Sequence, residues 1–248
     1  MTFLAVFLRV LRLCGFLFMA SSFMASSAIA ASFSVEPTRI FLKDTPQIVL
    51  KVGNAGESEV FIQTELMVWA QQDEKDVYTT SRDILVSPPM FKIPAGGEQT
   101  VRVRLMRGET SKLERTYRLF LQEVPQTQSA QATVSTSLKM GVPIFIQPEK
   151  VDPANFVWRV TRSADGLRVQ VSNTTNSHVQ LTGLRLSTSE GKVLSDEKVF
   201  VYVLPGHSYH WDVKLKQPFR EDKVVLQADS DRDEIKATVS LSATVVAP

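Results

Sequence analysis

The stretch Thr133-Val-Ser-Thr-Ser-Leu-Lys-Met-Gly-Val-Pro-Ile-Phe-Ile146 decides the fold of this chain. Successive side chains of an extended chain point to opposite faces, so every second residue shares a face. Small polar or charged residues occupy one face in the first half of the stretch. The other face is apolar apart from one threonine, and it carries Val134, Thr136, Leu138, Met140, Val142, Ile144 and Ile146. The pattern predicts a β-strand with one continuous apolar face.

The surroundings of this strand can be interpreted in two ways. It could be an ordinary interior strand of a sandwich, which periodicity alone favours. The polar, aperiodic segment 126–131 leads into it, however, so its first half could lie at a sheet edge. An exposed apolar edge accepts an unpaired strand from another molecule. On the second interpretation, the strand is used for binding.

The first thirty residues have the layout of a secretory signal peptide. Arg9 and Arg12 precede the apolar run 13–20, and a stretch of small residues ends at Ala28-Ile-Ala30, an Ala-x-Ala cleavage site. A single membrane anchor is the competing interpretation, but the apolar run is short and Ser-rich for a span. The mature chain is therefore expected to begin near Ala31.

Composition excludes several classes of function. The 28 basic and 26 acidic residues are interspersed, so there is no basic stripe of the kind that binds nucleic acid. Loss of Arg9 and Arg12 with the leader makes the mature chain formally neutral. The only cysteine, Cys14, also lies in the leader. The mature chain is expected to depend on its hydrophobic core, without a disulfide.

Short strands separated by turns are expected in the first half of the chain. Turns such as 53–56 and 94–97 contain glycine, and the Ser87-Pro88 peptide bond could be cis. Regularly spaced short strands without a helix indicate an immunoglobulin-like sandwich. The expected strands are Phe33–Glu36, Arg39–Leu42, Gln47–Val52, Glu59–Trp69, Tyr78–Val86, Phe91–Ile93, Thr100–Leu105, Arg118–Val124 and Thr133–Ile146.

A second set of strands follows the proline-containing link 147–153. These strands are Phe156–Arg162, Leu167–Ser172, Val179–Leu186, Val199–Leu204, Ser208–Leu215, Val224–Ala228 and Ile235–Val246. The chain is predicted to be all-β, with two tandem immunoglobulin-like β-sandwich domains set at an angle and a cleft between them. The expected boundaries are 1–30 for the signal peptide, 31–147 for the first domain and 148–248 for the second.

Arg39 has an unusual place in this pattern. It shares a strand face with Val35 and Phe41, so its guanidinium points along an apolar row. A buried arginine is costly unless it meets a carboxylate, and none is adjacent in sequence. The alternative is a side chain that extends to the rim of the sheet.

Several motifs, in their order and spacing, resemble those of periplasmic pilus chaperones of the chaperone-usher pathway (PapD-like). The resemblance runs from about Phe33 to the C-terminus, and three segments, from Tyr78, from Asp83 and from Gly141, are most similar to the archaic branch. The motifs are Glu36-Pro-Thr-Arg39, Val52-Gly-Asn-Ala-Gly56, Trp69, Ser87-Pro-Pro89, Pro94 to Arg102, Leu121-Gln-Glu-Val-Pro125, Pro143-Ile-Phe-Ile-Gln-Pro148 and Tyr202-Val-Leu-Pro-Gly206.

The resemblance implies a function and partners. In this family a pilus subunit is an immunoglobulin-like domain without its last strand, and the chaperone inserts its own strand into the gap. The apolar residues of that donor strand would be Val134, Thr136, Leu138, Met140 and Val142. The chaperone would deliver the subunit to an outer-membrane usher without any cofactor, and the free protein could hide its edge by self-association. No nucleic acid and no stable membrane insertion are expected.

The resemblance also implies an anchor for the subunit's C-terminal carboxylate, made by an arginine and a lysine. Arg39 matches the family's arginine. Pro143 stands at the position of the family's lysine, and Lys139, two pleats earlier on the same face, is expected to replace it. Lys139 could instead be a solvated side chain on a polar strand face.

A third implication of the resemblance concerns the junction of the two domains. Arg102 and Glu114 match the family's interdomain ion pair, and Asp229 or Asp231 is the expected third member. Exposed ion pairs contribute little stability, so these charges are expected to orient the domains more than to stabilise them. A plain surface ion pair is the alternative.

Other classes of function have less support. His178, His207 and His210 are the only histidines, and the last two, with Asp212, could form a fragment of a metal site or triad. On a strand, however, His207 and His210 point to opposite faces, and no nucleophile elbow or Gly-rich phosphate loop accompanies them. Neither catalysis nor a metal is expected. A secreted two-domain adhesin or carbohydrate-binding module fits the fold but leaves Arg39 without a role.

Overall fold

The computed structural model describes residues 33–43, 47–106, 111–125, 137–216, 219–241 and 244–247. The predicted signal peptide and the donor-strand residues Val134 and Thr136 lie outside these ranges. The described residues form eighteen strands, and they include no helix long and apolar enough to cross a membrane. Two pairs of sheets follow one another along the chain, so the all-β prediction is confirmed.

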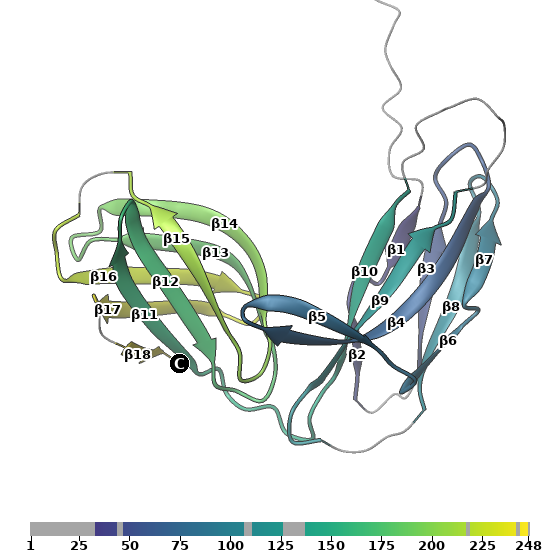
Figure 1. Cartoon of the computed structure of the whole chain (residues 1–248), viewed down its shortest axis with the longest axis horizontal. Helices are drawn as coiled ribbons and strands as arrows, with labels where there is room; N and C mark the ends of the chain where they lie inside the picture. Colours follow the sequence, from purple (N-terminus) through teal and green to yellow (C-terminus); the bar gives the residue numbers. More distant parts are fainter. Residues whose placement is uncertain are drawn as a thin grey trace, which may run out of the picture. The chain divides into compact units, whose positions relative to one another are not determined.

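The first sandwich consists of two sheets built from β1 to β10 (Figure 1). One sheet has the order β1-β3-β8-β6, and the other has the order β2-β10-β9-β4-β5, with β7 paired to β4. The strands are β1 (Ser34–Glu36), β2 (Ile40–Leu42), β3 (Gln47–Gly53), β4 (Val60–Gln72), β5 (Lys75–Thr80), β6 (Ile84–Ser87), β7 (Met90–Ile93), β8 (Glu98–Leu105), β9 (Arg115–Glu123) and β10 (Lys139–Ile146).

Alternating burial along the strands explains how these two sheets pack together. In β8, Val101 and Val103 are fully buried, whereas Arg102 between them is exposed. Leu50 of β3 and Leu119 of β9 belong to the same core. Burial of one such side chain contributes about 1.5–3 kcal/mol. The period-two pattern of the sequence therefore determines which face of each strand turns inward.

Two expected strands are divided in the structure, and one of them, Ile235–Val246, forms β17 (Glu234–Ser240) and β18 (Thr244–Ala247) in different sheets. The sequence predicts a single strand from Tyr78 to Val86, but β5 pairs with β4 in one sheet and β6 pairs with β8 in the other. Between them, the backbone N–H of Asp83 donates to the Ser81 hydroxyl (3.2 Å), a local turn that competes with strand pairing. The Ser87-Pro88 peptide bond is cis.

The hairpin of β4 and β5 contacts the second sandwich through hydrogen bonds. Its turn residues Asp73 and Glu74 have φ values of 49° and 61°, as in a two-residue type I′ turn. Gln71, close to the turn, donates to the carbonyl oxygen of Tyr202 (2.9 Å) and accepts from the N–H of Leu204 (3.0 Å). One amide side chain thus satisfies two backbone groups of the second sandwich.

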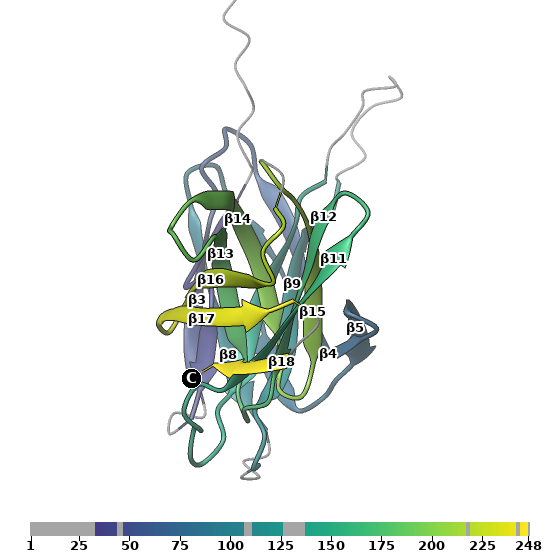
Figure 2. The same ribbon diagram turned by 90° about the vertical axis from the view of Figure 1, so that its left-hand side faces the viewer.

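The second sandwich consists of the sheets β15-β12-β11-β18 and β14-β13-β16-β17 (Figure 2). Trp158 and Phe156 of β11 are among its largest fully buried side chains. The strands are β11 (Phe156–Ser163), β12 (Gly166–Asn173), β13 (Val179–Ser187), β14 (Val193–Val203), β15 (Ser208–Lys214), β16 (Lys223–Ser230), β17 (Glu234–Ser240) and β18 (Thr244–Ala247).

A buried asparagine fixes the loop between β12 and β13. The Asn173 amide donates to the carbonyl oxygens of Ser177 (2.8 Å) and Val203 (2.9 Å) and accepts from the backbone N–H of Thr175 (3.0 Å). Buried polar groups that are fully hydrogen-bonded rigidify their surroundings. The loop therefore presents His178, its last residue, in a defined position.

Candidate functional site

The strand β10 is paired on both sides in its second half only. It pairs with β9 along its whole length, from Lys139 to Ile146. On its other side, the parallel strand β2 pairs only with the last three residues, Ile144 to Ile146. Within the described ranges, the backbone from Lys139 to Pro143 is left with one open edge. Such an edge is a template for the addition of another strand.

The predicted donor-strand residues differ in their exposure. Leu138 and Met140 are half-buried and pack against the core of the first sandwich. Val142 is 3% exposed and belongs to that core. Val134 and Thr136 precede the described part of the strand. The apolar face of β10 thus turns towards its own sandwich and becomes more accessible towards the N-terminal end.

The opposite face of β10 lies beside aromatic and cationic side chains of β9. Gly141 is paired with Phe120, and Pro143 with Arg118. A Cβ atom on Gly141 would lie 3.1 Å from side-chain atoms of both Arg118 and Phe120, so the glycine allows them to pack over the strand. The Lys139 ammonium lies 4.4 Å from the centre of the Phe120 ring.

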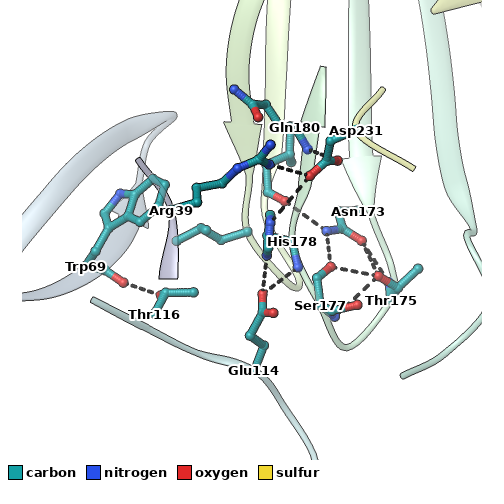
Figure 3. Close-up of polar contacts among 12 residues, drawn as sticks. Arg39, Trp69, Glu114, Thr116, Asn173, Thr175, Ser177, His178, Gln180 and Asp231 are labelled. Carbon is teal, nitrogen blue, oxygen red and sulfur yellow. Dashed lines mark hydrogen bonds and ion pairs between the residues drawn. The ribbon is translucent and has the colours of Figure 1, made fainter. Parts of the chain in front are cut away.

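Arg39 finds its carboxylate in the second sandwich. Its Nη1 donates to Asp231 Oδ2 over 2.9 Å, although the two residues are 192 positions apart in sequence (Figure 3). The other carboxylate oxygen of Asp231 accepts from the backbone N–H of Gln180 (2.9 Å). The carboxylate is mostly buried and the guanidinium is about one-third exposed. Asp231 therefore orients Arg39 while leaving part of its donor fork accessible.

His178 bridges two carboxylates from different sandwiches (Figure 3). Glu114 Oε2 accepts from the backbone N–H of His178 (2.8 Å) and lies 2.6 Å from its Nδ1. The His178 Nε2 lies 3.7 Å from Asp231 Oδ2. The ring also stacks on Phe145, with a centroid distance of 3.5 Å. The predicted members Glu114 and Asp231 are thus joined through a histidine that the sequence did not assign to this cluster.

Opposing effects set the pKa values of this cluster. Burial lowers the pKa of His178, but hydrogen bonds and charge from Asp231 and Glu114 outweigh it, so the pKa is raised above its ordinary 6.5. Burial raises the pKa of Asp231, but His178, the N–H of Gln180 and Arg39 outweigh it, so the pKa is lowered. The geometry therefore favours an imidazolium between two carboxylates.

The other two predicted members of the interdomain set lie elsewhere. Arg102 is exposed on β8, opposite Val49 of β3. Asp229 is exposed on β16 with its carboxylate against Gly183. In the described part of the chain, neither makes an ion pair with Glu114 or Asp231. Because side chains alternate along a strand, both positions point outward from their own sandwich.

Arg118 is a site residue that the sequence did not reveal. Its guanidinium carbon lies 4.0 Å from the centre of the Trp69 ring, and its side chain is 15% exposed. Because Pro143 pairs with Arg118, and Ile144 pairs with Ile40, Arg39 lies level with Pro143 on the other side of β10. The two arginines thus flank the position where the family's lysine was expected. Nothing in a strand that alternates regularly distinguishes such an arginine from a solvated one.

Lys139 lies further along the same strand. It is four residues from Pro143, or about 13 Å at about 3.3 Å per residue. Its ammonium is 3.9 Å from the exposed carboxylate of Glu65. The structure therefore brings Arg118, and not Lys139, to the level of Arg39.

Two histidines of the second sandwich have protein partners. His210 Nδ1 pairs with the carboxylate of Glu74 in the β4–β5 hairpin, and His207 Nδ1 lies 2.9 Å from the carbonyl oxygen of Pro205. Among the residues that the structure describes, no group of three or more histidine, cysteine, aspartate or glutamate residues could hold a metal ion.

Comparison with known proteins finds a family model that matches the first sandwich and solved structures that match both sandwiches. Residues 32–152 match the family model of the PapD N-terminal domain of pili and flagellar-assembly chaperones. No curated protein sequence matches the chain significantly. Solved structures that are 14–19% identical to the chain share its fold, which confirms the two tandem immunoglobulin-like sandwiches.

Three of these structures illustrate the similarity. The CsuC–CsuE chaperone-tip adhesion subunit complex of archaic Csu pili from Acinetobacter baumannii has 19% identity and a TM-score of 0.63, covering 86% of this chain and 100% of that chain. The E. coli chaperone DraB has 19% identity and a TM-score of 0.58 (84% and 97% covered). The Salmonella enterica SafA pilin in complex with the SafB chaperone has 18% identity and a TM-score of 0.57 (86% and 97% covered).

Proposed function

Residues 32–152 match the PapD N-terminal domain of pili and flagellar-assembly chaperones, and from that match we propose that this chain is such a chaperone and lends β10 to a pilus subunit. The subunit would be an immunoglobulin-like domain that lacks one strand. The observation that carries the proposal is the open edge of β10 from Lys139 to Pro143. Strand addition at such an edge provides main-chain hydrogen bonds for affinity and side-chain pockets for specificity.

The side chains that support this proposal lie at the N-terminal end of β10. Leu138 and Met140 are half-buried in the free chain, so a partner would complete their burial. Full burial of such a side chain is worth about 1.5–3 kcal/mol, and only the remaining exposed part is available here. Val134 and Thr136 would extend the ladder beyond the described residues. Val142, which is already in the core of the first sandwich, would hold the donor strand to its own domain.

The end of the inserted subunit strand would be held by charge. We assign Arg39 and Arg118 as the pair that binds the subunit's C-terminal carboxylate, because they flank Pro143 on the two sides of β10. Guanidinium groups bind carboxylates through two parallel hydrogen bonds, which fixes geometry as well as affinity. Lys139, the lysine expected from the sequence, would contact the subunit strand further from its end.

The chain would act in the periplasm and pass its subunit on to the site of fibre assembly. The predicted leader, residues 1–30, supports export to the periplasm. The chaperone would pass its subunit to an outer-membrane usher, where the subunit's neighbour replaces the lent strand. Exchange of one strand for a better-fitting one requires no nucleotide or cofactor. The pair of Glu114 and Asp231, joined through His178, would keep the two sandwiches in the orientation that binding requires.

Co-expression with a candidate pilus subunit tests this function. The wild-type chain is expected to give a one-to-one complex in size-exclusion chromatography, because the subunit cannot complete its fold alone. Met140→Glu is expected to abolish the complex, since it places a charge in the lent strand. Met90→Glu is the matched control, because Met90 is an exposed methionine (49%) on β7. A normal yield of complex with Met140→Glu would contradict the proposal, and a wild-type chain that binds no subunit would favour the adhesin alternative.

A further inference from the structure

Tyr202 at the end of β14 is fixed against the first sandwich by both its ring and its backbone. Its ring and the Trp69 ring pack edge to face, with a centroid distance of 5.3 Å and an interplanar angle of 83°, and its centroid lies 5.8 Å from that of Phe145. Its carbonyl oxygen accepts from the side chain of Gln71 (2.9 Å). The position of this phenol is therefore determined by residues of β4 and β10, although the tyrosine belongs to the second sandwich.

Both arginines of the proposed anchor lie next to this phenol. The Arg118 guanidinium carbon is 5.9 Å from the centre of the Tyr202 ring. Arg39 is held nearby by Asp231 (2.9 Å), whose carboxylate lies 3.7 Å from His178 Nε2, and the His178 ring lies 5.7 Å from the Tyr202 ring. The charge of Arg39 also acts on the phenol, since it works to lower the pKa of Tyr202. The Arg39 guanidinium has five N–H groups, one of which is used by Asp231. The Tyr202 ring thus lies close to both cations of the proposed anchor.

The phenol carries a proton that it can donate. Burial raises the pKa of Tyr202 above its ordinary 10.0, and the opposing effects of Arg39 and Arg118 do not cancel this rise. A neutral phenol next to two cations is suited to an anion that the cations attract, because it adds a directed hydrogen bond without a counter-charge.

We propose that the Tyr202 hydroxyl donates a hydrogen bond to the carboxylate that Arg39 and Arg118 bind, so that the second sandwich takes part in recognising the subunit's C-terminus. This inference rests on the proposed chaperone function. It assigns to the second sandwich a direct part in binding, beyond its contact with the first sandwich.

The experiment uses the mature chain and two synthetic peptides. Both have about ten residues with alternating valine and threonine, matching the two-residue period of a strand. One ends in a free carboxylate and the other in an amide. The measured quantity is the ratio of the two dissociation constants, because it isolates the recognition of the terminal charge. Tyr202→Phe removes the hydroxyl and keeps the ring, and Tyr209→Phe on β15 is the matched control.

The wild-type chain and Tyr209→Phe are expected to prefer the free acid by the same ratio. In Tyr202→Phe the preference is expected to fall about tenfold, the usual effect of losing one hydrogen bond to a charged group. An unchanged preference, or equal weakening of both peptides, would overturn the inference while leaving strand binding intact. Binding of neither peptide by the wild-type chain would count against the chaperone function itself, and the inference would fall with it.

Discussion

Replacing Glu114 tests whether the histidine bridge holds the two sandwiches together. In the structure, the Glu114 carboxylate is 1% exposed and accepts from both the backbone N–H and the ring of His178. Glu114→Ala leaves the buried N–H without an acceptor, which costs about 1–3 kcal/mol. It also removes one of two charges that stabilise the imidazolium. His178 can lose its proton in response, so the charge contribution is limited to about 1.4 kcal/mol for each unit of lost pKa elevation.

Together these effects predict that Glu114→Ala lowers the free energy of unfolding by about 2–4 kcal/mol. Glu114→Gln keeps an acceptor for the N–H and is expected to cost about half as much, mainly through the lost charge. Urea unfolding of the mature chain, followed by tryptophan fluorescence, measures both. Glu98→Gln on the exposed surface of β8 is the control, and it is expected to change stability by no more than about 0.5 kcal/mol.

The pH dependence of the stability difference tests whether the charge of His178 causes it. Because the pKa of His178 is raised, its protonated ring contributes to the stability of the folded chain. This contribution is fully present below about pH 6.5 and is lost as the pH rises through the raised pKa. The lowered pKa of Asp231 means that its contribution is present above about pH 3.8 and is lost as the pH falls through the lowered pKa. The difference between the wild-type chain and Glu114→Gln is therefore expected to be larger at about pH 5.5 than at about pH 8.5. An equal or larger difference at the higher pH would refute the assignment of a charged bridge.

Two further predictions concern the carboxylate anchor. Arg39→Ala is expected to abolish recovery of soluble subunit on co-expression while changing the stability of the chaperone by no more than about 1 kcal/mol, since the Arg39 side chain is about one-third exposed. Normal subunit yield would reject its role. Arg118→Ala is expected to reduce binding of a strand peptide with a free C-terminal carboxylate more than Lys139→Ala does, as measured by calorimetric titration. The reverse order would restore Lys139 as the second anchor.

Local periodicity was sufficient to predict the two sandwiches. Alternation such as that of Val101, Arg102 and Val103 depends on neighbouring residues alone, because burial of one strand face is a local property. The demand that Arg39 meet a carboxylate was also predictable from the cost of burying a charge. The identity of that carboxylate was not, since Asp231 lies in the other sandwich, 192 residues away.

The rest of the site depends on contacts between distant residues, which the alternation of side chains along a strand does not predict. Periodicity shows that Leu138, Met140 and Val142 share a face, but not that this face turns towards its own core at Val142. His178 follows a loop fixed by Asn173, and it acquires its role only when Glu114 and Asp231 approach it from two directions. Arg118 occupies a regular outward position, where charged residues are usual, so only the packing against Trp69 distinguishes it.

The continuity of β10 has a mechanical consequence. Hydrogen bonds of an antiparallel pair run perpendicular to the strands, so tension along β10 shears all of its bonds to β9 together instead of opening them one after another. The parallel strand β2 also pairs with β10 at Ile144 to Ile146, and these hydrogen bonds resist the same tension. If β10 binds a subunit as proposed, a pulled subunit is therefore expected to separate at the open edge, while β10 keeps its pairing with β9 and β2.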